Sequence, residues 1–250
     1  MEDKAFILED KKIKSIIKCL SDAIGDDVKG CLRRENLNER KSNGKKFLKW
    51  GLINRNFILN FSAGNLTAEY AKRGAWNMVP LYDRDTETIY TVMREERFKE
   101  IQRKHSIRKK AHYIDALVQS FNFDLNTEYQ MSLFEEQNFS EEEIKHIVDD
   151  IIRGFAIGES TVKRYRTILF EEYNSELTAV RCCILDSSLQ IVEEADWSKY
   201  IIHKESVVVD NVVDANESHT ANIKLKDKAH KKAGRRKLVA LKEKSKEQKV

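Results

Sequence analysis

The segment that decides the fold is WNMVPLYDRDTETIYTVM, residues 76–93. Two apolar stretches, MVPLYD and TIYTVM, flank the polar residues 84–87. Apolar runs on both sides of a short polar turn are typical of a β-hairpin. Pro80 has no N–H to donate to a strand ladder, so the first arm should be an edge strand or carry a bulge.

A second β-rich region lies downstream. Its predicted strands are residues 165–172, 177–185 and 189–193. Asn, Asp and Ser residues with good turn chemistry separate these strands, so the region predicts a three-stranded antiparallel meander. Cys182 and Cys183 are adjacent and should point to opposite faces of the sheet.

Helical periodicity marks other parts of the chain. Helices are predicted over residues 4–24, 27–40 and 94–121, and from Ser140 to Gly154. Gly25 should end the first of these helices, and the third should be interrupted near His105. Ser140 and Glu143 have the spacing of a capping box at the start of the last helix.

Several segments fit less regular patterns. Residues 45–61 suit either a buried helix or two strands, and the alternation of Phe57, Leu59 and Phe61 favours a strand over residues 56–62. A short strand is predicted at residues 130–134, a helical turn at 196–200 and a last strand at 207–213.

These elements indicate a mixed α+β class, with an antiparallel hairpin and a three-stranded meander packed with helices. We expect residues 1–214 to form a single body with a helical N-terminal part, residues 1–42. Residues 215–250 should form a basic, flexible tail. Hydrophobic residues make up 41% of the chain, which is enough for a packed core.

The cysteines are Cys19, Cys31, Cys182 and Cys183, and they lack metal-ligand spacing. They predict reduced thiols in a cytoplasmic protein, with a Cys19–Cys31 bridge as the alternative. No signal-peptide core or membrane-length apolar run occurs, so no membrane partner is expected. Glycine-rich phosphate loops are also absent, and we predict no cofactor.

Charge is sorted along the chain. Residues 224–250 hold twelve Lys or Arg and three acidic residues, a net of +9 in a chain of +4, so residues 1–223 carry −5. The densest cluster consists of Lys231, Lys232, Arg235, Arg236 and Lys237. Such a cluster binds nucleic-acid phosphates without sequence preference, and without aromatic residues it cannot stack on bases. The alternatives are a solvated end that aids solubility and a helix that faces a protein partner.

A second basic region lies on the predicted helix that follows the hairpin. Its candidate nucleic-acid-binding residues are Arg94, Arg97, Lys104 and Arg108, which come close together on a helix surface. They could line a groove for phosphates. The alternative is an exposed helix whose cations pair with neighbouring glutamates.

Two other groups carry weaker signals. Asp83, Asp85 and Glu87 could hold Mg²⁺ for phosphodiester hydrolysis, but a restriction-nuclease core needs an acid-x-lysine pair on the next strand, which is missing. Turn formation is the simpler interpretation. His105 and His112 lie seven residues apart, and no third ligand has fitting spacing. We predict no catalytic residues and no metal site.

Several short segments resemble one family. They are residues 71–74, 76, 81–83, 90–94, 112–114, 184–186 and 196–198. They resemble a group of uncharacterised bacterial and phage-borne proteins, a domain of unknown function. The resemblance implies no activity. It implies a bacterial or mobile-element context, in which defence and regulatory proteins are frequent.

We therefore expect a non-catalytic accessory protein that binds nucleic acid or a nucleoprotein. The basic helix would position the body, and the tail would add affinity and association rate. Two alternatives stay open. One is a metal-dependent nuclease, and the other is a protein-binding inhibitor or antitoxin-like module that uses the acidic body.

Overall fold

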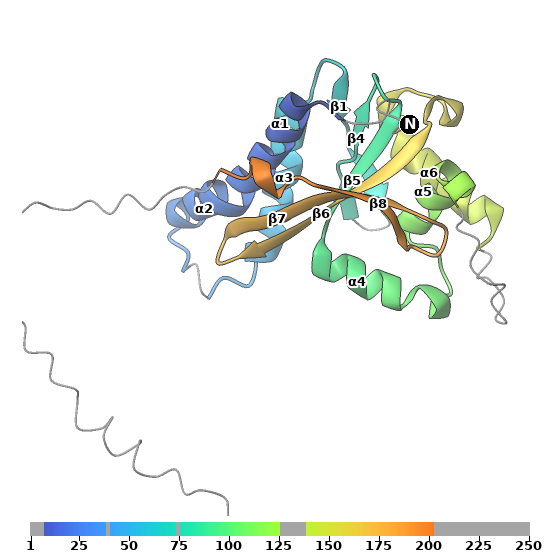
Figure 1. The fold of residues 1–250 in the computed structure, drawn as a ribbon. Helices are drawn as coiled ribbons and strands as arrows, with labels where there is room; N and C mark the ends of the chain where they lie inside the picture. Colours follow the sequence, from blue (N-terminus) through green and yellow to red (C-terminus); the bar gives the residue numbers. More distant parts are fainter. Residues whose placement is uncertain (1–7, 39–40, 74–75, 126–138, 203–250) are drawn as a thin grey trace, which may run out of the picture. The chain divides into compact units, whose positions relative to one another are not determined.

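The computed structural model describes residues 8–38, 41–73, 76–125 and 139–202 (Figure 1). Within these residues, a six-stranded sheet has the order β1-β4-β5-β6-β7-β8, and β2 pairs with β3 in a separate small sheet. The strands are β1 (Leu66–Ala68), β2 (Ala71–Arg73), β3 (Trp76–Met78), β4 (Leu81–Asp83), β5 (Thr88–Arg94), β6 (Arg164–Tyr173), β7 (Glu176–Leu185) and β8 (Ile191–Asp196). The predicted α+β class is confirmed. The strands predicted at residues 130–134 and 207–213, and the tail from residue 215, lie outside the described residues.

The two predicted β regions are confirmed and belong to one sheet. The hairpin is β4 with β5, and the meander is β6, β7 and β8. They join through β5 and β6, which run parallel in a register from Thr88↔Arg164 to Arg94↔Phe170. Parallel neighbours need a long crossover connection, and the helices between residues 95 and 152 supply it.

Pro80 does not mark an edge strand. β4 is an interior strand because β1 pairs with its outer side. Pro80 lies just before β4, where its missing N–H removes no ladder bond, and its carbonyl accepts from the Glu69 amide at 3.4 Å. The proline therefore separates β3 from β4 and sends the chain from the small sheet into the large one.

The N-terminal helix does not end at Gly25. A π-helical turn (Ala23–Asp27) connects α1 (Asp10–Asp22) to α2 (Val28–Arg34) without a break. Ala23, Ile24 and Val28 are fully buried across this turn. Burial of the continuous apolar stripe keeps the chain helical, and the π turn absorbs the shift in register.

The strand predicted over residues 56–62 is wrong, because that segment ends a helix, α3 (Lys45–Asn60). Its buried side chains are Leu52, Ile53, Asn56 and Phe57, a helical spacing. Leu59 is 68% exposed although Phe57 is fully buried. A strand would place these two residues on the same face, so their alternation with polar residues was coincidental.

Helices cover both faces of the sheet (Figure 1). α1, α2 and α3 pack on one face, over residues such as Ile168 and Phe170. The other face carries α4 (Glu95–Arg103), α5 (Tyr113–Phe121) and α6 (Glu141–Ile152). Cys182 belongs to the first core and Cys183 to the second, as predicted for adjacent strand residues. All four thiols are free, so no bridge joins Cys19 and Cys31.

Local turns agree with the sequence in part. A 3₁₀ turn (His105–Ile107) interrupts the basic helix where predicted, and another (Ser198–Tyr200) forms the predicted helical turn. α6 begins after Ser140, but the serine side chain makes no capping bond. Glu143 instead accepts from the Ala111 amide at 3.2 Å, which ties α6 to the segment before α5.

Candidate functional site

The candidate site lies where the parallel strands β5 and β6 end. Arg94 closes β5 and is in register with Phe170 of β6. The first turns of α3 lie over the same place, because Lys49 donates to Glu172 of β6 at 2.7 Å. The carboxyl ends of adjacent parallel strands are a common location for ligand binding in open α/β sheets.

One hollow at this place is basic. Its volume is about 500 Å³, and its charged side chains are Lys45, Lys46, Lys49, Arg94 and Glu172. Four cations against one carboxylate give this basic pocket a net charge of +3. The described residues together hold 30 Lys or Arg and 28 Asp or Glu, a net charge of only +2, so positive charge is concentrated at this pocket.

Glu172 orders two of these cations. Its carboxylate accepts from Lys49 and from Arg94, both at 2.7 Å, and its side chain is only 9% exposed. Lys45 donates to the Ser175 hydroxyl at 3.0 Å. Ser175 lies in the tight β6–β7 turn, which has left-handed backbone angles at Asn174 and Ser175. The Lys45 ammonium group is therefore held against the short β6–β7 turn.

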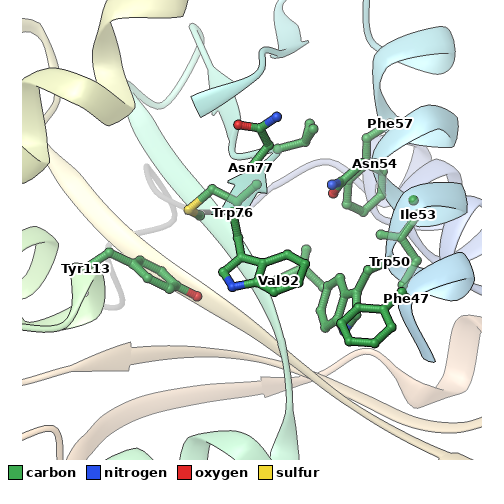
Figure 2. A pocket seen from close by; sticks show the side chains of 12 residues that line it. Phe47, Trp50, Ile53, Asn54, Phe57, Trp76, Asn77, Val92 and Tyr113 are labelled. Atoms are coloured by element: carbon green, nitrogen blue, oxygen red, sulfur yellow. The ribbon is translucent and has the colours of Figure 1, made fainter. Parts of the chain in front are cut away.

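A second hollow, the aromatic pocket, lies between α3 and β3 (Figure 2). Its volume is about 350 Å³. It is lined by Phe47, Trp50, Gly51, Ile53, Asn54, Phe57, Trp76, Asn77, Met78, Val79, Val92 and Tyr113. Most of these side chains are apolar, and the Asn54 amide and the Tyr113 hydroxyl supply polar groups (Figure 2). An apolar hollow with a few polar groups is typical of a ligand site.

The mouth of the aromatic pocket carries a stacked pair. The rings of Phe47 and Trp76 are 5.5 Å apart and tilted by only 9°. Phe47 is 64% exposed and Trp76 57% exposed. Below them Trp50 contacts Phe170 edge-on, with ring centroids 5.9 Å apart. Large aromatic side chains left in solvent beside a hollow often mark a binding surface.

The two pockets adjoin each other. Val92 lines the aromatic pocket and Arg94 lines the basic pocket, and residues two apart on a strand share a face. On α3, Phe47 and Trp50 face the aromatic pocket, while Lys46 and Lys49 face the basic one. We call the two pockets together the α3 groove.

Within the described part of the chain, the predicted basic residues have different acidic partners. Arg94 lies in the α3 groove. Arg97 and Lys104 both bind Glu100 on the exposed side of α4, at 2.5 and 2.7 Å. These two hydrogen bonds lower the pKa of Glu100 to about 2. Arg108 lies apart from them and pairs with Asp115 at 2.8 Å. Lys231, Lys232, Arg235, Arg236 and Lys237 lie outside the described residues.

Asp115 organises the start of α5. Its side chain is fully buried and accepts from His105 Nδ1 at 3.1 Å, from Arg108 at 2.8 Å and from the His112 amide at 2.7 Å. Burial favours a raised pKa for Asp115, but these hydrogen bonds and the Arg108 charge outweigh it and lower the pKa.

The two histidines do not converge on one ligand. His112 Nδ1 accepts from the Ile114 amide at 3.3 Å and caps α5, whereas His105 binds Asp115. Across the described parts of the chain, no three His, Cys, Asp or Glu side chains are grouped to hold a metal ion.

The acids of the hairpin turn have structural partners. Asp83 accepts from Lys12 at 2.5 Å and from the Thr86 hydroxyl at 2.7 Å. Asp85 binds the same lysine at 2.5 Å, and Glu87 pairs with Lys163. These acids are at the start of β5, at the opposite end of the strand from the α3 groove. Turn formation and anchoring of α1 account for them.

Comparison with known proteins identifies the family. A family model described as a family of unknown function, DUF5986, matches residues 6–241. The chain belongs to the DUF5986 family. The DUF5986 match includes both pockets of the α3 groove and the basic segment 231–237, and it confirms the predicted membership in an uncharacterised family. No curated protein and no solved structure matches the chain.

Sequence reasoning missed most of the α3 groove. The signal is KKFLKW, residues 45–50, in which lysines alternate with aromatic and aliphatic side chains. This interleaving indicates a binding surface only once the segment is known to be a helix, which presents the two kinds of side chain along adjacent rows.

Among the described helices, none is both long enough and apolar enough to cross a bilayer.

Proposed function

We propose that this protein binds nucleic acid through the α3 groove, with the basic pocket contacting phosphates. The observation that carries the proposal is the set of four cations around Glu172, next to an exposed aromatic pair. Cations that neutralise phosphates release counterions from the nucleic acid, which gives affinity without sequence preference.

The arrangement of the cations suits a phosphate backbone. Glu172 already holds Lys49 and Arg94 in place, so these side chains would lose less conformational entropy when nucleic acid binds. Lys46 is exposed and takes part in none of the ion pairs among the described residues. Its ammonium group is thus available to a phosphate without first breaking an ion pair.

The basic tail has a supporting role in this proposal. Its cations would raise the association rate and add interactions that depend on salt. Arg97 and Lys104 share Glu100 on the exposed side of α4 and line neither pocket of the α3 groove, so they are assigned no role. The acidic hairpin turn is also left out, so the proposal includes no hydrolysis.

The test is fluorescence-anisotropy binding of labelled DNA and RNA by the full chain over a series of salt concentrations. Lys46→Glu should weaken binding by about tenfold or more and reduce the dependence on salt, because an attraction to a phosphate becomes a repulsion. Lys104→Glu makes the same charge change on α4 and should have a much smaller effect. Equal losses of affinity for both variants would indicate only a general effect of net charge and would contradict the proposal.

A further inference from the structure

We propose that the aromatic pocket receives one unpaired base, so that the preferred ligand is single-stranded nucleic acid. This inference rests on the proposed function, because the basic pocket must hold the phosphates of the same strand. It adds a substrate class, since phosphate contacts alone would not distinguish a single strand from a duplex.

The stacked pair provides the first reason. Trp76 and Phe47 are stacked nearly parallel and are more than half exposed, so a base can extend the stack on an outer face of the pair at the mouth of the pocket (Figure 2). Every base has a π-face, and stacking on aromatic side chains is the usual means by which proteins hold single strands. Removal of one such platform weakens binding on the order of tenfold.

The polar groups of the pocket provide the second reason. The amide of Asn54 offers a donor and an acceptor, which is the pattern on the edges of bases. This amide takes part in no hydrogen bond among the described residues. The aromatic pocket is lined by no charged side chain, so it suits an uncharged planar ring better than a phosphate.

Size and position provide the third reason. A volume of about 350 Å³ lies at the small end of the range for ligand pockets, which suits one ring system. Val92 and Arg94 are about 7 Å apart along β5, so a base in the aromatic pocket could keep its phosphate near the basic pocket. A paired base must leave its stack to reach the pocket, at a cost in free energy.

The experiment uses the full chain and compares two probes, each as DNA and as RNA. One is a single strand of about 12 nucleotides, and the other is a hairpin whose stem pairs that strand with its complement. We expect the single strand to bind at least tenfold more tightly. Trp76→Ala should remove most of that preference by weakening single-strand binding far more than duplex binding, and Trp76→Phe should retain it. Phe123→Ala is the control, because Phe123 is 69% exposed and lies outside the groove.

Tryptophan emission gives an independent readout. The chain has three tryptophans; Trp76 is 57% exposed and Trp50 lines the same pocket, whereas Trp197 is 5% exposed. A base that stacks on Trp76 should quench its emission. In a strand with only one base that can stack, replacement of that base by an abasic position should abolish the quenching. Trp76→Phe should lose the part of the quenching that comes from Trp76, leave the part that comes from Trp50, and retain affinity.

The results separate the two proposals. If single strands and duplexes bind equally and Trp76→Ala has no effect, while Lys46→Glu still weakens binding, the base pocket is wrong and the phosphate site stands. If no nucleic acid binds at low salt, both proposals fail. Protection of Trp76 only by an apolar peptide would also overturn the base pocket in favour of a protein partner.

Discussion

At the scale of single residues, Glu172 has two opposing effects. Its carboxylate anchors Lys49 and Arg94 through hydrogen bonds of 2.7 Å, but it also cancels one of the positive charges of the basic pocket. A residue that both builds a cationic site and weakens its field should show opposite effects on stability and on affinity when it is replaced.

We predict that Glu172→Gln lowers the free energy of unfolding by about 1–2 kcal/mol, a value reduced for the partial exposure of its partners. The same substitution raises the net charge of the pocket from +3 to +4 and should tighten nucleic-acid binding. Urea denaturation and anisotropy measure the two effects. Glu96→Gln on exposed α4 is the control. A decrease in affinity together with a decrease in stability would show that anchoring matters more than charge.

Asp115 predicts a dependence of stability on pH. Its pKa is lowered in the folded protein, so the ionised carboxylate stabilises the fold above the pKa of the unfolded chain. That contribution is lost as the pH falls through the lowered folded value. Asp115→Asn should lower the unfolding free energy near neutral pH by about 2–4 kcal/mol.

The asparagine variant should also lose less stability than the wild type between neutral pH and about pH 3, below the ordinary Asp pKa of about 3.9. Urea denaturation at both pH values measures the difference. Parallel losses of stability in the two proteins would mean that other carboxylates account for the acid sensitivity. Asp124→Asn, which removes a partner of Arg164 on the surface, provides a comparison.

At the scale of secondary structure, α3 decides whether the groove exists. A strand over residues 56–62 would have placed Phe57 and Leu59 on the same face, whereas the helix buries the first and exposes the second. Substitution of these two large apolar residues therefore distinguishes a helix from a strand in this segment.

Phe57→Ala should lower the free energy of unfolding by about 3–4 kcal/mol, because it empties a fully buried site. Leu59→Ala should change it by less than about 0.5 kcal/mol. Thermal or urea denaturation of the two variants is sufficient. Similar large decreases for both would argue that residues 56–60 are not helical.

Elements with local signals could be predicted from the sequence. The hairpin and the meander are closed by short turns, so the information lies within a few residues, and the α6 stripe is strictly periodic. The parallel pairing of β5 with β6 could not be predicted, because it joins segments separated by three helices. The π turn at Gly25 was also missed, since tertiary burial outweighed the helix-breaking tendency of glycine.

The candidate site was predicted only in part, for the same reason. Arg94 was identified from its charge. Lys46 and Trp76 lie 30 positions apart in the sequence and meet in one groove only after α3 packs on the sheet. Charge could also mislead at single positions, because Arg108 serves a buried carboxylate and not a surface.

At the scale of the whole molecule, the distribution of charge suggests different roles for the α3 groove and for the basic tail. The described residues are close to neutral overall and carry a local positive groove, while residues 224–250 are strongly basic. If the tail adds only electrostatic attraction, its contribution should not depend on whether the ligand is paired.

Replacement of Lys231, Lys232, Arg235, Arg236 and Lys237 by glutamine in the full chain should weaken binding to single strands and duplexes by the same factor. The slope of affinity against salt should fall by about 0.7–0.9 for each phosphate that the tail no longer neutralises. Salt-series anisotropy measures both quantities. A tail variant that alters only single-strand binding would instead place the tail within the recognition site.

The pairing of Lys49 with Glu172 spans 123 positions, and this distance governs when the groove can exist during synthesis. Because translation begins at the N-terminus of the protein, α3 and the hairpin leave the ribosomal exit tunnel before β6. Until β6 follows, Glu172 cannot order Lys49 and Arg94, so under the proposed function the nascent protein should bind nucleic acid only weakly. Occupancy of the groove by nucleic acid would then report that β6 has left the ribosome.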